Sequence, residues 1–200
     1  MKVRSRATHA WMVLAGFLIH CGVLGAADTL ANSRAANAAT LDFGGKVYLH
    51  RWSKGGQHEF TPEGDEDLSR WRDMVTLNTH DAVRNGEQLA ALANSVLSNY
   101  QGHGKIVRTD SKPRTPQRPA EHLIVAILGN PQFLEAAFAR IVLVDGVGEA
   151  AVYSHRIYGK EAARLMGEWL KANGAVIEKT LMAWDGIPAP ATLRSLPQSK

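Results

Sequence analysis

The chain has 200 residues, of which 45% are hydrophobic and 21% are charged, and this is the composition of an ordinary folded soluble protein. Its formal net charge of +4 overstates how basic the body is, because three of the 23 Lys and Arg residues precede residue 28, where there is no acid. The remaining 20 face 19 Asp and Glu, and so small an excess excludes a nucleic-acid footprint, which needs clustered cations. The single cysteine, Cys21, lies in the same early segment, so the rest has no disulfide and no Cys-based metal site.

Residues 1–27 have the layout of a secretory signal peptide. Three basic residues and no acid open the segment, namely Lys2, Arg4 and Arg6. An apolar run then covers residues 11–24, and the small residues at 25–27 offer a cleavage point before Asp28. The sequence therefore predicts an exported protein, either periplasmic or secreted.

Two other interpretations of this segment stay open. A membrane anchor is one, although the apolar run is shorter than the roughly 20 residues that span a bilayer. Lipidation at Cys21 is the other, although His20 stands where a bacterial lipobox has a small residue. Residues 28–43 offer little to bury, so we expect them to form a flexible tail in either case.

The folded part begins with a predicted hairpin. Its strands are residues 46–52 and 57–61, because Gly55-Gly56 between them tolerates the positive φ of a tight turn. Residues 63–71 suggest a short helix with acids in its first turn, where the helix dipole favours them. Residues 72–79 read as a third strand.

The clearest helix follows, and the side chain of Asn85 can cap its first turn. Its apolar positions recur at helical spacing and form one stripe: Leu89, Leu92, Ala93, Val96, Leu97 and Tyr100. Residues 105–109 then predict a short strand, and residues 111–119 a loop whose three prolines exclude both helix and central strand.

Three consecutive strands form the centre of the predicted fold, at residues 122–128, 134–144 and 149–158. Their connections are too short for a crossover helix, so neighbouring strands must pair antiparallel. Two further helices are expected between residues 160 and 184, separated by a left-handed cap at Asn173-Gly174.

These elements predict an α+β fold in which an antiparallel sheet of about six to seven strands is flanked by helices. The sheet and its helices make a single domain, residues 44–187, after the N-terminal signal segment. Residues 188–200 contain three prolines, and we expect them to be a disordered C-terminal tail.

The histidines give no clear chemical site. None of the six after residue 27 has the spacing of a metal motif, so no metal ligand is assigned. His50 and His58 could meet across the first hairpin, either as surface residues or as part of an open His and carboxylate zinc site.

Two groups of residues are candidate ligand-binding sites. His155, Arg156 and Tyr158 end the last strand just before a helix, where layered folds often carry sites, although the alternative is a hydrogen-bonded core residue. The strongest basic cluster suits an anionic ligand, a lipid headgroup or an acidic partner, and the alternative is a loop that its charges keep solvated. Its members are Arg108, Lys112, Arg114 and Arg118.

No catalytic residue is assigned and no cofactor is expected. The chain has no Gly-x-Ser-x-Gly elbow, no phosphate loop and no Rossmann fingerprint. A serine nucleophile such as Ser53 or Ser154 needs a partner histidine that the sequence does not place.

The phrase Glu59-Phe60-Thr61-Pro62, through Trp71 to Met74-Val75-Thr76, resembles small secreted bacterial proteins of unassigned function. The layout of a meander flanked by helices is similar to the Mog1/PsbP-like group. That group consists largely of binding, assembly or accessory domains without a shared catalytic residue set. The resemblance implies a binding role and transfers no functional residue, because a fold does not carry function.

The sequence thus predicts an exported, non-enzymatic domain that binds an unknown protein partner or a small anionic ligand. Neither nucleic acid nor a stable membrane span after cleavage is expected. The alternative is a metal-dependent or His-assisted hydrolase of the cell envelope.

Overall fold

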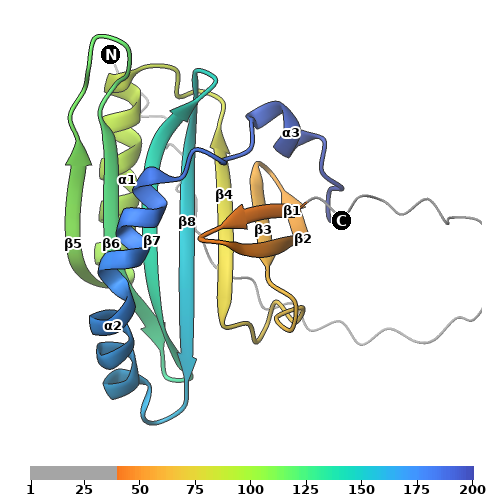
Figure 1. Ribbon diagram of the computed structural model, residues 1–200, viewed down its shortest axis with the longest axis vertical. Coiled ribbons are helices and arrows are strands. Elements are labelled where there is room, and N and C mark those ends of the chain that lie inside the picture. Colours follow the sequence, from red (N-terminus) through yellow and green to blue (C-terminus); the bar gives the residue numbers. More distant parts are fainter. Residues whose placement is uncertain (1–39) are drawn as a thin grey trace, which may run out of the picture. The chain divides into compact units, whose positions relative to one another are not determined.

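The computed structural model describes residues 40–200, and the predicted signal segment 1–27 and residues 28–39 lie outside the described part (Figure 1). The predicted flexible tail extends too far, because its last four residues, Thr40–Phe43, form strand β1. Leu41 and Phe43 from this strand are buried in the main hydrophobic core, and their burial explains why so short a segment is ordered.

Residues 40–200 form one α+β domain built on an open, eight-stranded antiparallel sheet. The strand order is β1-β2-β3-β4-β8-β7-β6-β5, so β4 and β8 pair although the chain between them contains α1 and three other strands. The strands are β1 (Thr40–Phe43), β2 (Lys46–Lys54), β3 (Gln57–Thr61), β4 (Asp73–His80), β5 (Gly104–Lys112), β6 (Glu121–Asn130), β7 (Phe133–Val144) and β8 (Val147–Tyr158). The antiparallel pairing and the flanking helices are confirmed, with eight strands in place of six to seven.

Two long helices cover opposite faces of the sheet, α1 (Gly86–His103) and α2 (Ala162–Ala183) (Figure 1). Alternation along β7 separates the two faces, because Ala137 and Ala139 pack towards α1 while Ala136 and Phe138 pack towards α2. No helix in residues 40–200 combines the length and apolar character needed to cross a membrane.

Helix α1 begins as the sequence predicts. The side-chain oxygen of Asn85 accepts a hydrogen bond of 2.9 Å from the backbone N–H of Gln88, which satisfies one of the free donors of the first turn. Leu89 and Ala93 from the predicted stripe are buried, and the other four stripe residues pack against the same cluster.

The predicted break at Asn173-Gly174 is wrong, because α2 runs through it. Met166 and Leu181, on either side of the break, are both buried in the main core, and their packing outweighs the roughly 1 kcal/mol that glycine costs inside a helix. Asn173 also supports the helix, since its side-chain N–H donates to the backbone oxygen of Trp169 at 2.9 Å.

The helix expected at residues 63–71 is also absent, and turns replace it. Aspartates there satisfy backbone donors that a helix would have used. Asp67 accepts from the backbone N–H of Ser69 at 2.9 Å, and Asp65 accepts from that of Asp73 at 3.0 Å.

The C-terminal residues 188–200 differ from the predicted disordered tail. They contain the short helix α3 (Pro190–Arg194), which starts with proline at a position that needs no backbone donor. Leu193 and Leu196 are buried in the main core, so the domain extends beyond residue 187 to the end of the chain.

Candidate functional site

The predicted residue His155 lies in a group of polar side chains that we call the Asp73 cluster: Lys46, Asp73, Tyr153 and His155. Strand pairing positions the cluster, because Asp73 at the start of β4 stands directly opposite His155 on β8. Trp169 from α2 covers the imidazole of His155, with ring centroids 4.0 Å apart and an angle of 2° between the ring planes.

The Asp73 carboxylate accepts from all three other members of the cluster. The hydroxyl of Tyr153 and Nδ1 of His155 donate to Oδ1 at 2.9 and 2.8 Å, and the ammonium of Lys46 donates to Oδ2 at 3.0 Å. Burial acts to raise the pKa of Asp73, but these hydrogen bonds and the Lys46 charge outweigh it and hold that pKa well below its ordinary value. Burial and the Asp73 charge also raise the pKa of Tyr153.

An ionised Asp73 can only accept hydrogen bonds, so the proton of a neutral His155 ring must be on Nδ1. Its Nε2 then carries the lone pair, which is the arrangement of a carboxylate-oriented general base. The side chain of His155 is 15% exposed. The cluster therefore has the chemistry of a base beside a partly open surface.

Arg156 and Tyr158, predicted to bind with His155, contact other parts of the domain. Arg156 projects from the opposite face of β8 to His155, and its guanidinium lies between the rings of Trp71 and Phe133, at 3.9 and 4.1 Å. It also pairs with Glu135 at 2.7 Å. The hydroxyl of Tyr158 donates to the backbone oxygen of Trp71. The three predicted residues do not form one site.

Arg108 and Lys112 lie on β5, the edge strand, and border a hollow of about 360 Å³ between that strand and α2. Both have partners already. Arg108 pairs with Asp110 at 2.8 Å and with Glu178 at 3.4 Å. Lys112 pairs with Glu121 at 3.3 Å and donates to the backbone oxygen of Met182.

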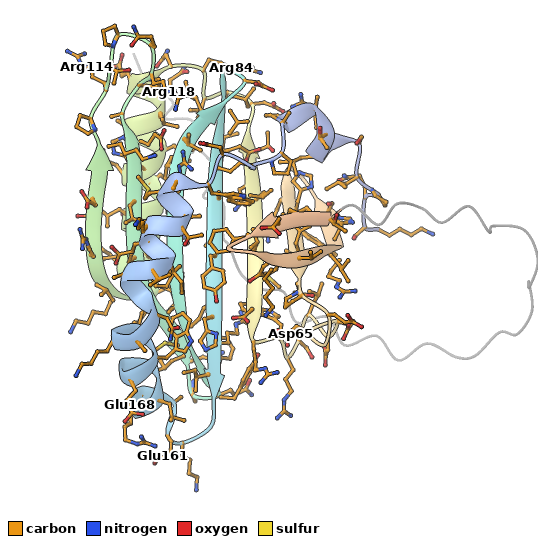
Figure 2. All side chains as sticks on the ribbon, in the orientation of Figure 1. Asp65, Arg84, Arg114, Arg118, Glu161 and Glu168 are labelled. Carbon is orange, nitrogen blue, oxygen red and sulfur yellow. The ribbon has the colours of Figure 1, made fainter. Side chains whose placement is uncertain are left out.

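Arg114 and Arg118 lie in the loop between β5 and β6, where they line a second hollow of about 610 Å³. Both are exposed, and neither makes an ion pair with another residue of the described range 40–200. Figure 2 shows them with Arg84 at one end of the sheet, whereas Glu161 and Glu168 lie at the other end. Glu87 also lines this hollow, but it makes no ion pair with either arginine within residues 40–200, so the hollow combines open space with two unpaired cations.

The first hairpin holds a second polar group, which we call the Ser53 cluster: His50, Ser53 and His58. The Ser53 hydroxyl lies 2.8 Å from Nδ1 of His58 and 2.6 Å from Nε2 of His50. Ser53 is opposite His58 in the register of β2 and β3, and both are almost fully buried. Burial lowers the pKa of each histidine, and in His58 the neighbouring His50 lowers it further, so both rings are neutral near pH 7.

Two buried side-chain atoms on this face have no hydrogen-bond partner within residues 40–200: Nε2 of His58 and Oε2 of Glu149. The other oxygen of Glu149 accepts from the hydroxyl of Thr79 at 2.7 Å. Burial raises the pKa of Glu149 to about 7, against the weaker opposing effect of that hydrogen bond. Buried polar atoms without partners are few in native proteins, so each calls for an explanation.

Sequence reasoning missed most of these relationships. Asp73, Trp169 and Glu135 gain their roles only from pairing between distant segments. Glu149 did leave a signal, because it is the one carboxylate in the otherwise apolar start of β8, on the side shared with Ala151 and Tyr153.

Within residues 40–200, no group of three or more His, Cys, Asp or Glu side chains is placed to hold a metal ion. Comparison of the sequence with models of known protein families and with curated proteins gives no match.

Proposed function

We propose that the chain is an exported, periplasmic or secreted, non-enzymatic domain that binds anionic groups of a partner protein or of a small ligand. The binding surface is the hollow beside Arg114 and Arg118. The observation that carries the proposal is the lack of any ion pair for these two exposed arginines within the described residues. Guanidinium groups bind carboxylates and phosphates through two parallel hydrogen bonds, so both kinds of anion fit.

The other predicted cations argue for this choice by contrast. Arg108, Lys112 and Arg156 each contact a carboxylate already, so an incoming anion would have to displace an internal partner. Arg114 and Arg118 lie together at one end of the sheet and raise the local concentration of anions there, whereas Arg84 at the same end already pairs with Asp81 at 3.9 Å (Figure 2). The likeness to the Mog1/PsbP-like group, with its binding and accessory domains, supports the same role.

Two probes test the proposal with the full-length chain. Inorganic phosphate, followed by calorimetry, represents a small ligand, and a fluorescent ten-residue polyglutamate peptide, followed by anisotropy, represents an acidic partner segment. We expect at least one probe to bind, with an affinity that falls as salt rises. The double variant Arg114→Gln/Arg118→Gln should weaken binding roughly tenfold, since it removes two charge-assisted contacts.

The matched control is Lys171→Gln, which removes an exposed cation from α2, away from the hollow. It should leave the affinity unchanged. Equal losses in the control and in the double variant would mean that only net charge matters, and binding of neither probe would refute the proposed site. Binding of phosphate alone would identify a small anion, and binding of the peptide alone an acidic partner.

A second candidate function is a His-assisted hydrolase, and one observation favours it. His58 lies within hydrogen-bond reach of Ser53, so the serine has the partner histidine that a nucleophile needs. Burial of both side chains weighs against this candidate, because a substrate must reach the hydroxyl. Labelling of Ser53 by a fluorophosphonate probe, with loss of labelling in His58→Ala, would support the hydrolase and contradict the non-enzymatic proposal.

A further inference from the structure

The last eleven residues, 190–200, cross the face of the sheet that contains the Ser53 cluster, and we call them the C-terminal strap. One anchor joins Arg194 to Asp81, just after β4, with 2.9 Å between the charged groups. The other anchor is on β2, where the backbone N–H of Ser199 donates to the backbone oxygen of Ser53 at 2.7 Å. Figure 1 shows α3 near the ends of β3 and β4, and Arg194 of the first anchor is the last residue of this helix.

The strap is held by few contacts. Its helix α3 has only five residues, too few to be stable without packing. Pro190, Leu193 and Leu196 provide its buried surface, and the Arg194–Asp81 pair is exposed and therefore weak. Segments with few buried contacts open locally before the whole domain unfolds, so the strap is the part of this face best suited to open by itself.

The two buried atoms without partners lie on the face that the strap crosses. His58 stands opposite Leu77 on β4, and Glu149 stands opposite Thr79, two positions further along the same strand. Both residues project towards the side of the sheet that contains Leu193 and Leu196. Opening of the strap would let water reach the Nε2 and Oε2 atoms that lack partners when it is closed.

We infer that the C-terminal strap is a proton-controlled cover over two buried polar groups, the Ser53–His58 pair and Glu149. The strap stays closed while Glu149 is protonated and His58 is neutral. Loss of the Glu149 proton, or gain of a proton by His58, places an uncompensated charge beneath it and favours the open form. The cover therefore has two triggers of opposite pH dependence.

The difference in pKa between the closed and open forms decides whether each group favours opening at high or at low pH. In the closed form the pKa of Glu149 is raised from 4.5 to about 7, so closure is fully favoured below pH 4.5 and is lost as the pH rises towards 7. If opening restores the ordinary value, the opening equilibrium increases by up to roughly 300-fold over that range. The pKa of His58 is lowered in the closed form, so its contribution is full above pH 6.5 and is lost as the pH falls.

Neighbouring charges modify both triggers. Asp81 raises the pKa of Glu149 and Arg194 lowers it, so the anchor pair of the strap itself faces this carboxyl. On the hairpin side, His50 lowers the pKa of His58. Movement of Arg194 away on opening removes a cation that stabilises ionised Glu149, but water then solvates the carboxylate instead.

Hydrogen–deuterium exchange of the full-length chain tests the inference between pH 4.5 and pH 8.5. After correction for the intrinsic pH dependence of exchange, we expect protection of residues 195–199 to fall from pH 6.5 to pH 8.5, where only Glu149 still changes its charge. Between pH 4.5 and pH 6.5 the two triggers act in opposite directions and largely cancel. Residues 89–97 of α1 are the internal reference and should keep their protection throughout. Parallel loss in α1 would mean global unfolding and would overturn the inference, as would constant strap protection from pH 4.5 to pH 8.5.

Two near-isosteric variants separate the triggers. Glu149→Gln keeps an acceptor for Thr79 without a charge, so it should abolish the alkaline loss of protection and reveal a loss below pH 6.5 that comes from His58 alone. His58→Asn keeps an amide near Ser53, and its strap protection should fall steadily as the pH rises from 4.5 to 8.5, because only Glu149 then responds. A Glu149→Gln profile that still falls at alkaline pH as in the unaltered chain would show that Glu149 does not control the strap.

Discussion

The Asp73 cluster and the Ser53 cluster lie on the same face of one sheet, yet their histidines differ in both burial and hydrogen bonding. His155 is partly exposed, and it shares a carboxylate with a tyrosine and a lysine. His58 is buried, its one side-chain hydrogen bond within residues 40–200 is with the Ser53 hydroxyl, and its Nε2 has no partner there. The partly exposed Asp73 cluster has the more complete hydrogen bonding. The buried Ser53 cluster contains an atom, Nε2 of His58, that has no hydrogen-bond partner within residues 40–200.

We infer from this difference that the Asp73 cluster is a structural junction, whereas His58 and Glu149 are candidate functional groups. A carboxylate that accepts three charge-assisted or hydroxyl bonds joins β2, β4 and β8, and any change there has a cost. A buried imidazole and a buried carboxyl with unpaired atoms respond to protons, because their neutral forms alone suit the closed interior. Partial exposure of His155 is therefore a poorer guide to function than the incomplete bonding of His58 and Glu149.

The largest effect that sharpens this contrast is expected for Asp73→Ala. Removal of the carboxylate leaves Tyr153, His155 and Lys46 without their shared acceptor, and two of these groups are mostly buried. We expect the free energy of unfolding to fall by about 3 kcal/mol, as measured by urea denaturation at pH 7.

Asp73→Asn is the control for this variant. It keeps an acceptor oxygen but loses the charge, so it should cost about half as much as Asp73→Ala. A loss below about 0.5 kcal/mol in Asp73→Ala, the range of an ordinary surface substitution, would contradict the interpretation of this cluster as a junction.

A smaller loss is expected for Ser53→Ala in the buried cluster. The change removes the hydroxyl that contacts His50 and His58, so their facing nitrogens lose a partner without gaining water. Such unpaired groups cost about 2 kcal/mol. Denaturation near pH 7.5, where both rings are neutral, measures the loss, and no loss at all would mean that these short contacts contribute nothing to stability.

The sequence predicted most of the framework that carries both clusters. The alternation in β2, β4, β7 and β8, the continuous apolar run in β6, and the helical stripe from Leu89 are local patterns that each segment carries by itself. Strand β1 was not predicted, because its four residues are too few to show a clear alternation of apolar and polar side chains. The order of residues 190–200 was not predicted, because three prolines in residues 188–200 suggested disorder. Leu193 and Leu196 become buried only by packing against residues distant in the sequence.

The sites were harder to predict for a physical reason. Asp73 and His155 are 82 residues apart, and they meet only because β4 pairs with β8 in one register. The sequence placed His155 at a strand end but could not supply its carboxylate. Ser53 and His58 are five residues apart in the predicted hairpin, yet a one-residue shift in register would have turned them to opposite faces.

The smallest expected effect concerns the stack of Trp169 on His155, and a double-mutant cycle measures it. Trp169→Leu and His155→Ala are each compared with the double variant, so that the coupling free energy isolates the contact between the two rings. Parallel rings 4.0 Å apart should give a coupling of about 1 kcal/mol. A coupling near zero would mean that Asp73 alone holds His155. The histidine would then be held at one nitrogen only, beside a partly open surface, and it would again be a candidate base. A clear coupling would mean that Trp169 holds the face of the His155 ring while Asp73 holds its edge. Both contacts are needed if His155 is to join α2 to the sheet.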